Sequence, residues 1–279
     1  MPKPYTPPTG RLKTKQRSFE EVVRDVRHAV FSVVRMRPTA TPNVFDTIAL
    51  GSGFFVSPTL FMTCYHVFDS KAFPHKDGDN YRLIANVGNG NPVIHEATNV
   101  QKGSNLHFYP NDDMALLQFP AGPARPFVAL DYKDKLEGCE IGIAGYPLGQ
   151  VVDINGQQGY KHMIFRVVRS IVTASYLTDW TDEFGTLTDV PVIELHLMIT
   201  PGNSGGPVFD LRTGRVVAFV KGFRPYKSVE RLEKIQTPNL TLPAGMSQDY
   251  MTSIYSVYSY AVKMERVRPN LEAMGIKLD

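Results

Sequence analysis

The sequence predicts a mainly β protein, built as a barrel or a sandwich, with a helix near each end. Between about residues 33 and 220, short apolar or β-branched runs are broken by Gly, Pro, Asn and Asp, which is the pattern of strands joined by turns. These runs do not alternate with helical segments, so an α/β fold is not favoured. The 279 residues, 43% hydrophobic and 20% charged, suffice for a full core in one large domain or two small lobes.

The N-terminal region contains two different segments. Residues 1–17 combine four prolines with Lys and Arg and few apolar residues, which predicts a basic, proline-rich, disordered tail. Ser18 can then cap a helix that has Glu20 and Glu21 in its first turn. The apolar residues at helical spacing are Phe19, Val22, Val23, Val26 and Val30. The spacing therefore predicts a helix over residues 18–36.

The strand-like runs continue through most of the remaining chain. They cover residues 48–57, 59–68, 81–88, 114–119, 140–147, 163–177, 190–199, 205–210 and 214–222. Residues 253–262 predict one more strand, and residues 261–275 a closing helix with a proline at its boundary. The long polar segment 220–250 predicts a surface loop with a short helix around 229–235.

Charge and cysteine content exclude several classes of protein. A net charge of +3 without a dense basic patch does not favour a nucleic-acid partner. No run of about 18 apolar residues predicts a membrane span, and the N-terminus lacks the apolar segment of a signal peptide, so a cytoplasmic location is expected. Cys64 and Cys139 form no C-x-x-C pair, which excludes a zinc ribbon and a disulfide framework.

No metal or other cofactor is expected. The chain has no H-E-x-x-H motif and no pair of histidines four residues apart. The histidines outside the motifs discussed below are scattered: His75, His95, His107, His162 and His196.

Three short stretches carry the residue types needed for nucleophilic catalysis. A serine hydroxyl is a weak nucleophile that needs a histidine to take its proton and a third group to orient the imidazole. "TPGNSGGPVFD" places Ser204 on a glycine-rich loop, "FMTCYHVF" places His66 at the end of a predicted strand, and Asp113 precedes the strand "MALLQF". Each stretch alone is also compatible with turn or core chemistry. A phosphate-binding loop would need a lysine and a following helix, and the serine loop has neither.

In the order His, Asp, Ser, these stretches resemble the chymotrypsin-like serine proteases, most closely the cysteine-poor HtrA-type and other bacterial trypsin-like peptidases. The resemblance also includes "GSGFFVS", "GYPLG" and "GRVVAFVKG" and covers about residues 30–265. It implies two six-stranded antiparallel β-barrels within a protease domain over 18–265. The N-terminal helix and first barrel would occupy about 18–125 and the second barrel about 126–262, with a C-terminal helix or tail at 263–279.

The resemblance also implies roles for individual residues. Ser204 would be the acylated nucleophile, His66 the general base and acid, and Asp113 the group that orients the imidazole. The neighbouring Asp112 is not expected to have that role. The oxyanion hole would be formed by the N–H groups of Gly202 and Ser204.

For the specificity pocket, the resemblance points to segments before and after the serine loop. The candidate substrate-binding residues are Met198, Ile199, Thr200, Val220, Lys221 and Gly222. No Asp occupies the base of this pocket, so cleavage after Lys or Arg is not expected. We expect instead an apolar pocket. Cys64 stands where family members usually carry Ala, and its apolar surroundings make it a poor nucleophile.

The sequence therefore predicts a serine endopeptidase that cleaves protein or peptide substrates through an acyl-enzyme intermediate. The alternative is a catalytically silent or latent chymotrypsin-like scaffold that acts as a binding or signalling module. An esterase would need a G-x-S-x-G elbow and βα alternation. Only about 17 residues follow residue 262, too few for a PDZ domain, so control is expected from loop ordering, a regulatory partner or homo-oligomer formation.

Overall fold

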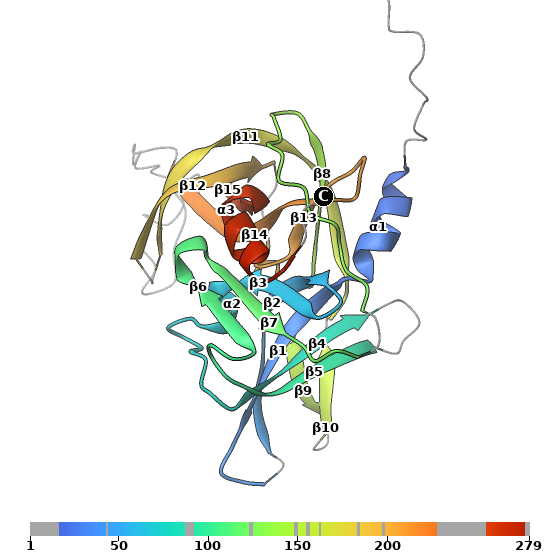
Figure 1. Ribbon diagram of the computed structural model, residues 1–279, viewed down its shortest axis with the longest axis vertical. Helices are drawn as coiled ribbons and strands as arrows, with labels where there is room; N and C mark the ends of the chain where they lie inside the picture. Colours follow the sequence, from blue (N-terminus) through green and yellow to red (C-terminus); the bar gives the residue numbers. More distant parts are fainter. Residues whose placement is uncertain are drawn as a thin grey trace, which may run out of the picture.

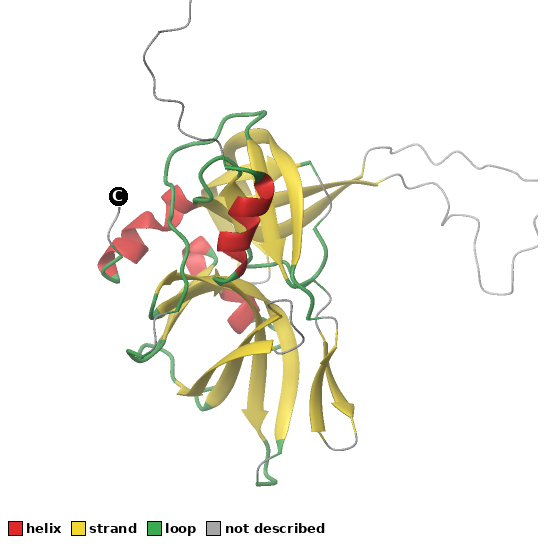
Figure 2. Cartoon of the chain, turned by 90° about the vertical axis from the view of Figure 1, so that its right-hand side faces the viewer, coloured by secondary structure: helices red, strands yellow, loops and turns green. Residues whose placement is uncertain are grey.

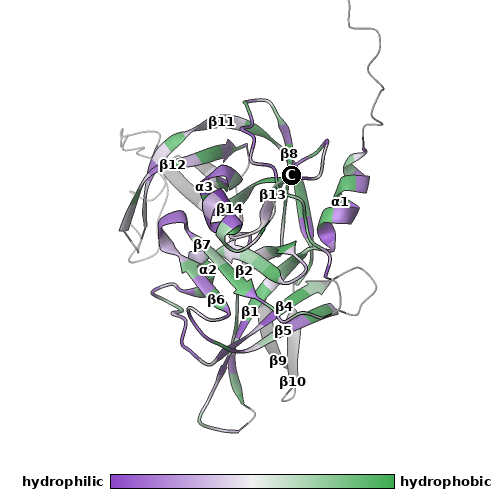
Figure 3. Ribbon diagram, viewed as in Figure 1, coloured by the Kyte–Doolittle hydropathy of each residue, from purple (hydrophilic) through white to green (hydrophobic). Residues whose placement is uncertain are grey.

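Two antiparallel β-sheets lie one above the other in the computed structural model (Figure 1, Figure 2). The structure describes residues 17–42, 44–86, 92–122, 125–147, 150–154, 157–161, 163–182, 185–196, 199–227 and 255–276. The predicted N-terminal tail, apart from residue 17, and the predicted short helix around 229–235 lie outside these residues. Hydrophobic residues run through the strands of both sheets (Figure 3), as expected for sheets that each bury one face.

The N-terminal helix is shorter than its spacing predicts. Helix α1 is Phe19–Arg27 and begins with a capping box, in which the Ser18 hydroxyl accepts from the Glu21 N–H and the Glu21 carboxylate accepts from the Ser18 N–H. Strand β1, Val30–Pro38, replaces the predicted second half of the helix. It pairs with a strand on each side, and its β-branched residues suit this buried sheet position better than a helix.

The first sheet contains seven strands in the order β5-β4-β1-β2-β3-β7-β6. Besides β1 these are β2 Phe45–Ser57, β3 Leu60–Cys64, β4 Asp79–Asn86, β5 Pro92–Val100, β6 Leu106–Tyr109 and β7 Met114–Gln118. Its core includes Phe31, Phe55 and Phe61, whose rings meet edge to face at 5.2–6.5 Å. The sheet has one strand more than predicted, because the four-residue β6 adds to its edge next to β7.

The second sheet is a closed barrel in the order β11-β12-β15-β14-β13-β8, which confirms six strands here. Its strands are β8 Glu140–Gly145, β11 Arg166–Asp182, β12 Gly185–Leu195, β13 Pro207–Asp210, β14 Val216–Lys227 and β15 Tyr255–Lys263. A separate hairpin of β9 Gln150–Ile154 and β10 Gln157–Lys161 lies beside the first sheet (Figure 2).

The predicted closing helix is present as α3, Met264–Ala273. It follows β15 directly and buries Met264, Val267 and Leu271 in the main core. Pro269 lies inside the helix rather than at its boundary. None of the helices in the described part of the chain combines the length and apolarity needed to cross a bilayer.

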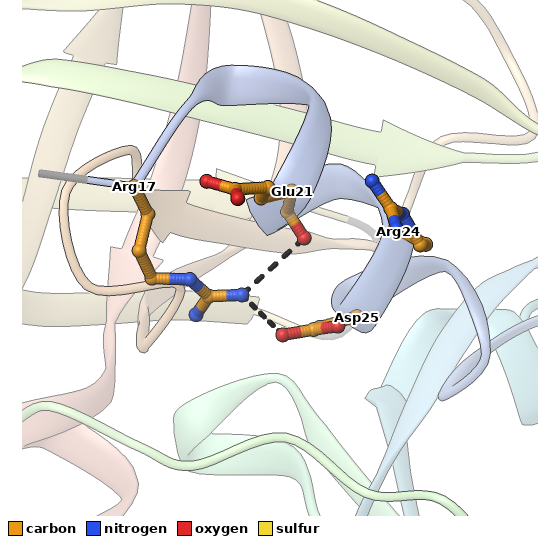
Figure 4. A pocket seen from close by; sticks show the side chains of 4 residues that line it. All are labelled: Arg17, Glu21, Arg24 and Asp25. Atoms are coloured by element: carbon orange, nitrogen blue, oxygen red, sulfur yellow. Dashed lines mark hydrogen bonds and ion pairs between the residues drawn. The ribbon is translucent and has the colours of Figure 1, made fainter. Parts of the chain in front are cut away.

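Helix α1 is attached to the second barrel. Val22 and Val26 are buried on its inner side, and the Arg17 guanidinium donates to the Thr213 carbonyl in the turn between β13 and β14. On its outer side a shallow hollow is lined by Arg17, Glu21, Arg24 and Asp25 (Figure 4), where Arg17 pairs with Asp25 and donates to the Glu21 carbonyl. Two of the opposite charges that line the hollow, those of Arg17 and Asp25, therefore already neutralise each other.

Candidate active site

His66 lies just beyond the end of strand β3. The strand ends at Cys64, and Tyr65–Phe68 form the one-turn helix α2, so the prediction that His66 lies at the end of a strand is wrong by two residues. The Tyr65 N–H donates to the Asp113 carbonyl at 3.0 Å, which closes this turn against the start of β7. The His66 side chain remains 29% exposed.

Asp113 is held in an unusual backbone conformation directly before β7. The 3-10 turn η1, Pro110–Asp112, precedes it, and Asp113 itself has φ 47° and ψ 42°, a left-handed conformation that Asp tolerates better than most residues. Its carboxylate accepts from His66 Nδ1 at 3.0 Å (Oδ2) and 3.1 Å (Oδ1), and from the His66 backbone N–H at 3.2 Å. With Nδ1–H donating to the carboxylate, Nε2 is left as the free proton acceptor of the neutral imidazole.

The Asp113 carboxylate is ionised although it is only 2% exposed. Burial by itself raises its pKa, but the charges of His66 and Lys221 and their hydrogen bonds outweigh burial and lower the pKa of Asp113 well below its usual range. The Lys221 ammonium donates to Oδ2 at 2.8 Å. His66 and Lys221 therefore share one buried carboxylate.

The adjacent Asp112 carboxylate has different partners. It accepts from Arg266 Nε at 2.7 Å and from Asn270 Nδ2 at 2.6 Å, both on helix α3. Two successive carboxylates thus divide their contacts, with Asp113 bonded to His66 and Asp112 bonded to α3. Sequence reasoning alone could not pair Asp112 with α3, because the partners are more than 150 residues apart.

The loop around Ser204 fits tightly between the two sheets. Gly205 has φ +81°, and a Cβ there would lie 2.1 Å from Thr63 Oγ1 and 2.3 Å from the Ser52 carbonyl oxygen. A Cβ at Gly206 would lie 2.3 Å from the Ala144 carbonyl oxygen. Both glycines are therefore required by close backbone approach, and Gly205 also by its conformation.

Ser52 connects the serine loop to the first sheet. Its N–H donates to the Ser204 carbonyl at 2.9 Å, and its hydroxyl donates to the Gly202 carbonyl at 2.6 Å. The hydroxyl also accepts from the Tyr146 N–H at 2.8 Å. Ser52 lies in "GSGFFVS", so a motif used only for the resemblance contains a residue that fixes the serine loop.

Alternate N–H groups of the loop are left without an acceptor. The N–H groups of Asn203, Gly205 and Gly206 donate to the carbonyls of Thr200, Val220 and Asn203 at 2.8–3.2 Å. In the described part of the chain, the N–H groups of Gly202 and Ser204 have no acceptor. These are the two donors expected to stabilise an oxyanion.

The Ser204 hydroxyl donates to the Lys221 carbonyl at 3.4 Å. Within the described residues no hydrogen bond joins Ser204 to His66, so the structure brings His66 and Asp113 into contact and places Ser204 beside Lys221. Lys221 contacts both Ser204 and Asp113, because its carbonyl accepts from the Ser204 hydroxyl and its ammonium donates to the Asp113 carboxylate. The sequence places Lys221 among the pocket residues and gives no position for its head group.

The other predicted pocket residues are distributed unevenly. The side chains of Ile199 and Val220 are buried in the core of the second barrel, so they can contact a ligand mainly through their backbones. Thr200 is half-buried, and the Cβ position of Gly222 has open space around it. Met198 lies outside the described residues.

Cys64, His66 and Asp113 each place one potential metal-ligand atom within 4.8 Å of the others. The Cys64 thiol is fully buried, burial raises its pKa, and it donates to the Val220 carbonyl at 3.1 Å. The Lys221 ammonium already occupies one Asp113 oxygen. A neutral thiol and an adjacent cation make a poor site for a metal ion, and they also argue against Cys64 as a nucleophile.

Comparison with solved structures finds similar folds at low identity. The active form of the Rv3671c protease from M. tuberculosis matches with 19% identity and a TM-score of 0.57, covering 98% of this chain and 95% of that one. Its inactive form matches with 20% identity, a TM-score of 0.51 and coverage of 91% and 92%. The HtrA-type protease AlgW with a decapeptide matches with 18% identity, a TM-score of 0.51 and coverage of 93% and 67%. At these identities the likeness concerns the fold.

A family model decides the assignment. No curated protein matches the chain. The model of the trypsin-like peptidase domain matches residues 51–219, which is more than half of the chain and includes the His66, Asp113 and Ser204 stretches. The chain therefore belongs to the trypsin-like peptidase family and is a serine endopeptidase.

Proposed function

We propose that Ser204, His66 and Asp113 form a catalytic triad that hydrolyses peptide bonds through an acyl-enzyme intermediate. The observation that carries this proposal is the buried Asp113 bonded to His66 Nδ1 at 3.0 Å, with Lys221 in contact with both this carboxylate and the Ser204 hydroxyl. A carboxylate in this place holds the imidazole in the tautomer that accepts a proton at Nε2. Without that orientation Ser204 would remain a weak nucleophile.

Acylation would proceed in two stages. Ser204 Oγ attacks the carbonyl carbon of the scissile bond while its proton passes to His66 Nε2, and the oxyanion is stabilised by the N–H groups of Gly202 and Ser204. The C–N bond then breaks, and His66 gives its proton to the leaving amine. The product is an ester between Ser204 and the acyl part of the substrate.

Deacylation repeats these steps with water. His66 Nε2 takes a proton from water as the water oxygen attacks the ester carbonyl, and the proton returns to Ser204 Oγ when the C–O bond breaks. In the described structure the hydroxyl rests on the Lys221 carbonyl. The mechanism therefore requires rotation about the Cα–Cβ bond of Ser204 toward the imidazole before attack.

We further propose a preference for an apolar residue on the acyl side of the scissile bond. The Lys221 ammonium, the nearest candidate charge among the predicted pocket residues, points to Asp113 instead of a pocket. Ile199 and Val220, buried in the barrel core, bring no charge to the pocket, and the space next to Gly222 is open. Dominant cleavage after Arg or Lys in a peptide library would contradict this preference.

A fluorophosphonate probe tests the triad, since it reacts covalently only with an activated serine. Wild-type protein is expected to be labelled, while the S204A and H66A variants are not. A tryptic peptide map would place the label on the peptide that contains Ser204. The absence of labelling over a wide pH range would instead support the latent scaffold, which the hydrogen bond of the Ser204 hydroxyl to a carbonyl favours.

A further inference from the structure

Lys221 is a buried cation next to the proposed triad. It is only 3% exposed, its ammonium donates to Asp113 Oδ2 at 2.8 Å, and the ammonium lies 4.9 Å from the centre of the Trp180 ring. Its backbone carbonyl accepts from the Ser204 hydroxyl. One residue therefore contacts both the carboxylate and the hydroxyl through different atoms.

An irregularity in β14 explains this double contact. The pairing of β14 with β15 shifts between Val220 and Gly222, which places Lys221 at the irregularity. A bulge of this kind redirects a side chain and leaves backbone groups free for other bonds. The regular pairing of Val220 on one side and Gly222 on the other keeps Lys221 in place.

We propose that Lys221 is a positioning residue for the reaction, acting through Asp113 on His66. This inference rests on the proposed triad. The ammonium holds Oδ2, the oxygen that also lies 3.0 Å from His66 Nδ1, so that the carboxylate stays aligned with the imidazole. Lys221 does not contact the substrate in this arrangement.

The ammonium also has an electrostatic effect on His66. The Lys221 ammonium is permanently charged and is bonded to the same carboxylate as His66. Its charge therefore disfavours a second positive charge on the imidazole. Within the described residues, the charged and titratable groups in contact with this cluster include Asp113 before β7, Cys64 at the end of β3 and His66 itself, and burial keeps Cys64 a neutral thiol.

The test compares K221M with K221R and with the matched control K263M. Lys263 is also buried in the second barrel, but its ammonium pairs with Asp134 at 2.6 Å rather than with the site. In K221M, kcat is expected to fall about tenfold or more with a smaller change in KM. The acid limb of kcat/KM is expected to move up by about one pH unit.

K221R retains the charge, so its acid limb is expected to stay at the wild-type position. K263M is expected to leave both kcat and the acid limb unchanged. If K221M and K263M behave alike while wild type is active, the positioning role is wrong and the triad proposal stands.

Two measurements do not depend on activity. In an S204A background, NMR titration of the His66 imidazole is expected to show the same upward move of its midpoint on K221M, and an unmoved midpoint would overturn the inference even in an inactive protein. The fluorescence of Trp180, the single tryptophan of the chain, is expected to change in K221M and not in K263M.

A double variant keeps the proposal testable if K221M folds poorly. D113N/K221M removes both charges, so it is expected to be more stable than K221M, which leaves a buried carboxylate with one cation fewer. In the D113N background K221M is expected to produce no further move of the His66 titration. Additive effects of the two substitutions would contradict an action through Asp113.

Discussion

The two sides of the candidate active site are held by different kinds of interaction. On the side of the first sheet, His66 and Asp113 are fixed by charged side chains, with distances of 2.8–3.1 Å around one buried carboxylate. On the side of the second barrel, the Ser204 loop is fixed by backbone hydrogen bonds and by glycines with no room for a Cβ. The first side should therefore respond to changes of charge and pH, and the second to changes of volume.

The largest expected effect comes from removing the charge on the first side. D113N is expected to lower kcat roughly 10⁴-fold, because the amide stabilises the wrong tautomer of His66. D112N should lower kcat at most about fivefold, since Asp112 contacts α3 through one partly exposed ion pair and one hydrogen bond. Steady-state kinetics on both variants checks this, and a larger loss in D112N would reverse the assignment of the two carboxylates.

G205A tests the effect of added side-chain volume in the Ser204 loop, on the second-barrel side of the site. The added Cβ would collide with the Ser52 carbonyl and Thr63 Oγ1 in a left-handed conformation, so the free energy of unfolding is expected to fall by about 2 to 4 kcal/mol. Urea denaturation provides the measurement. G222A is the matched control, because its Cβ would meet no atom within 4 Å, and its unfolding free energy should change by about 0.5 kcal/mol or less.

Lowering the pH should destabilise the folded protein through protonation of Asp113, on the first-sheet side of the site. Its folded pKa lies below its usual value, so its contribution to stability is present above the unfolded pKa of about 3.9 and is lost as the pH falls toward the folded pKa. Other carboxylates with lowered pKa values contribute to the same slope: Asp79, Asp131, Asp134 and Asp210.

Unfolding free energies measured between pH 2 and pH 5 test this contribution. D113N is expected to flatten the pH dependence. D134N should flatten it less, because Asp134 is half exposed. Equal slopes in wild type and D113N would mean that Asp113 is not held ionised by folding.

The smallest expected effect is that of C64A. Alanine loses a weak thiol hydrogen bond to Val220 and little volume, so activity should stay within about threefold and stability should fall by about 1 kcal/mol. Iodoacetamide should modify the half-buried Cys139 and leave the buried Cys64 unreacted in the folded protein. Loss of activity on Cys64 alkylation would revive the cysteine as nucleophile.

Short motifs made much of the site predictable. The stretches around His66, Asp113 and Ser204 each combine an apolar strand with a polar turn, so the local pattern places them close to strand ends, although it does not predict the one-turn helix that contains His66. The requirement for Gly205 and Gly206, by contrast, comes from the close approach of Ser52, Thr63 and Ala144, which are distant in sequence. The catalytic roles of these residues stay predictions until the probe experiment is done.

What could not be predicted depends on contacts distant in sequence. The valines of residues 30–36 continue a helical spacing, and only pairing with β2 and β4 makes this segment a strand. Likewise, the alternation in β14 gives no sign of the irregularity at Lys221, and therefore none of the ion pair with Asp113. Strand β6 has only four residues, and the apolar residues of β5 do not alternate regularly with polar ones, so neither strand stands out from loops.

Helix α3 has a consequence for the order of assembly. It follows both sheets in the chain, yet Arg266 and Asn270 on this helix anchor Asp112, the residue next to the proposed triad carboxylate. During synthesis the segment that carries Asp113 therefore gains these contacts only after the described strands of both sheets have been made. Its fixation would then be a late event in folding, one that joins the two halves of the molecule.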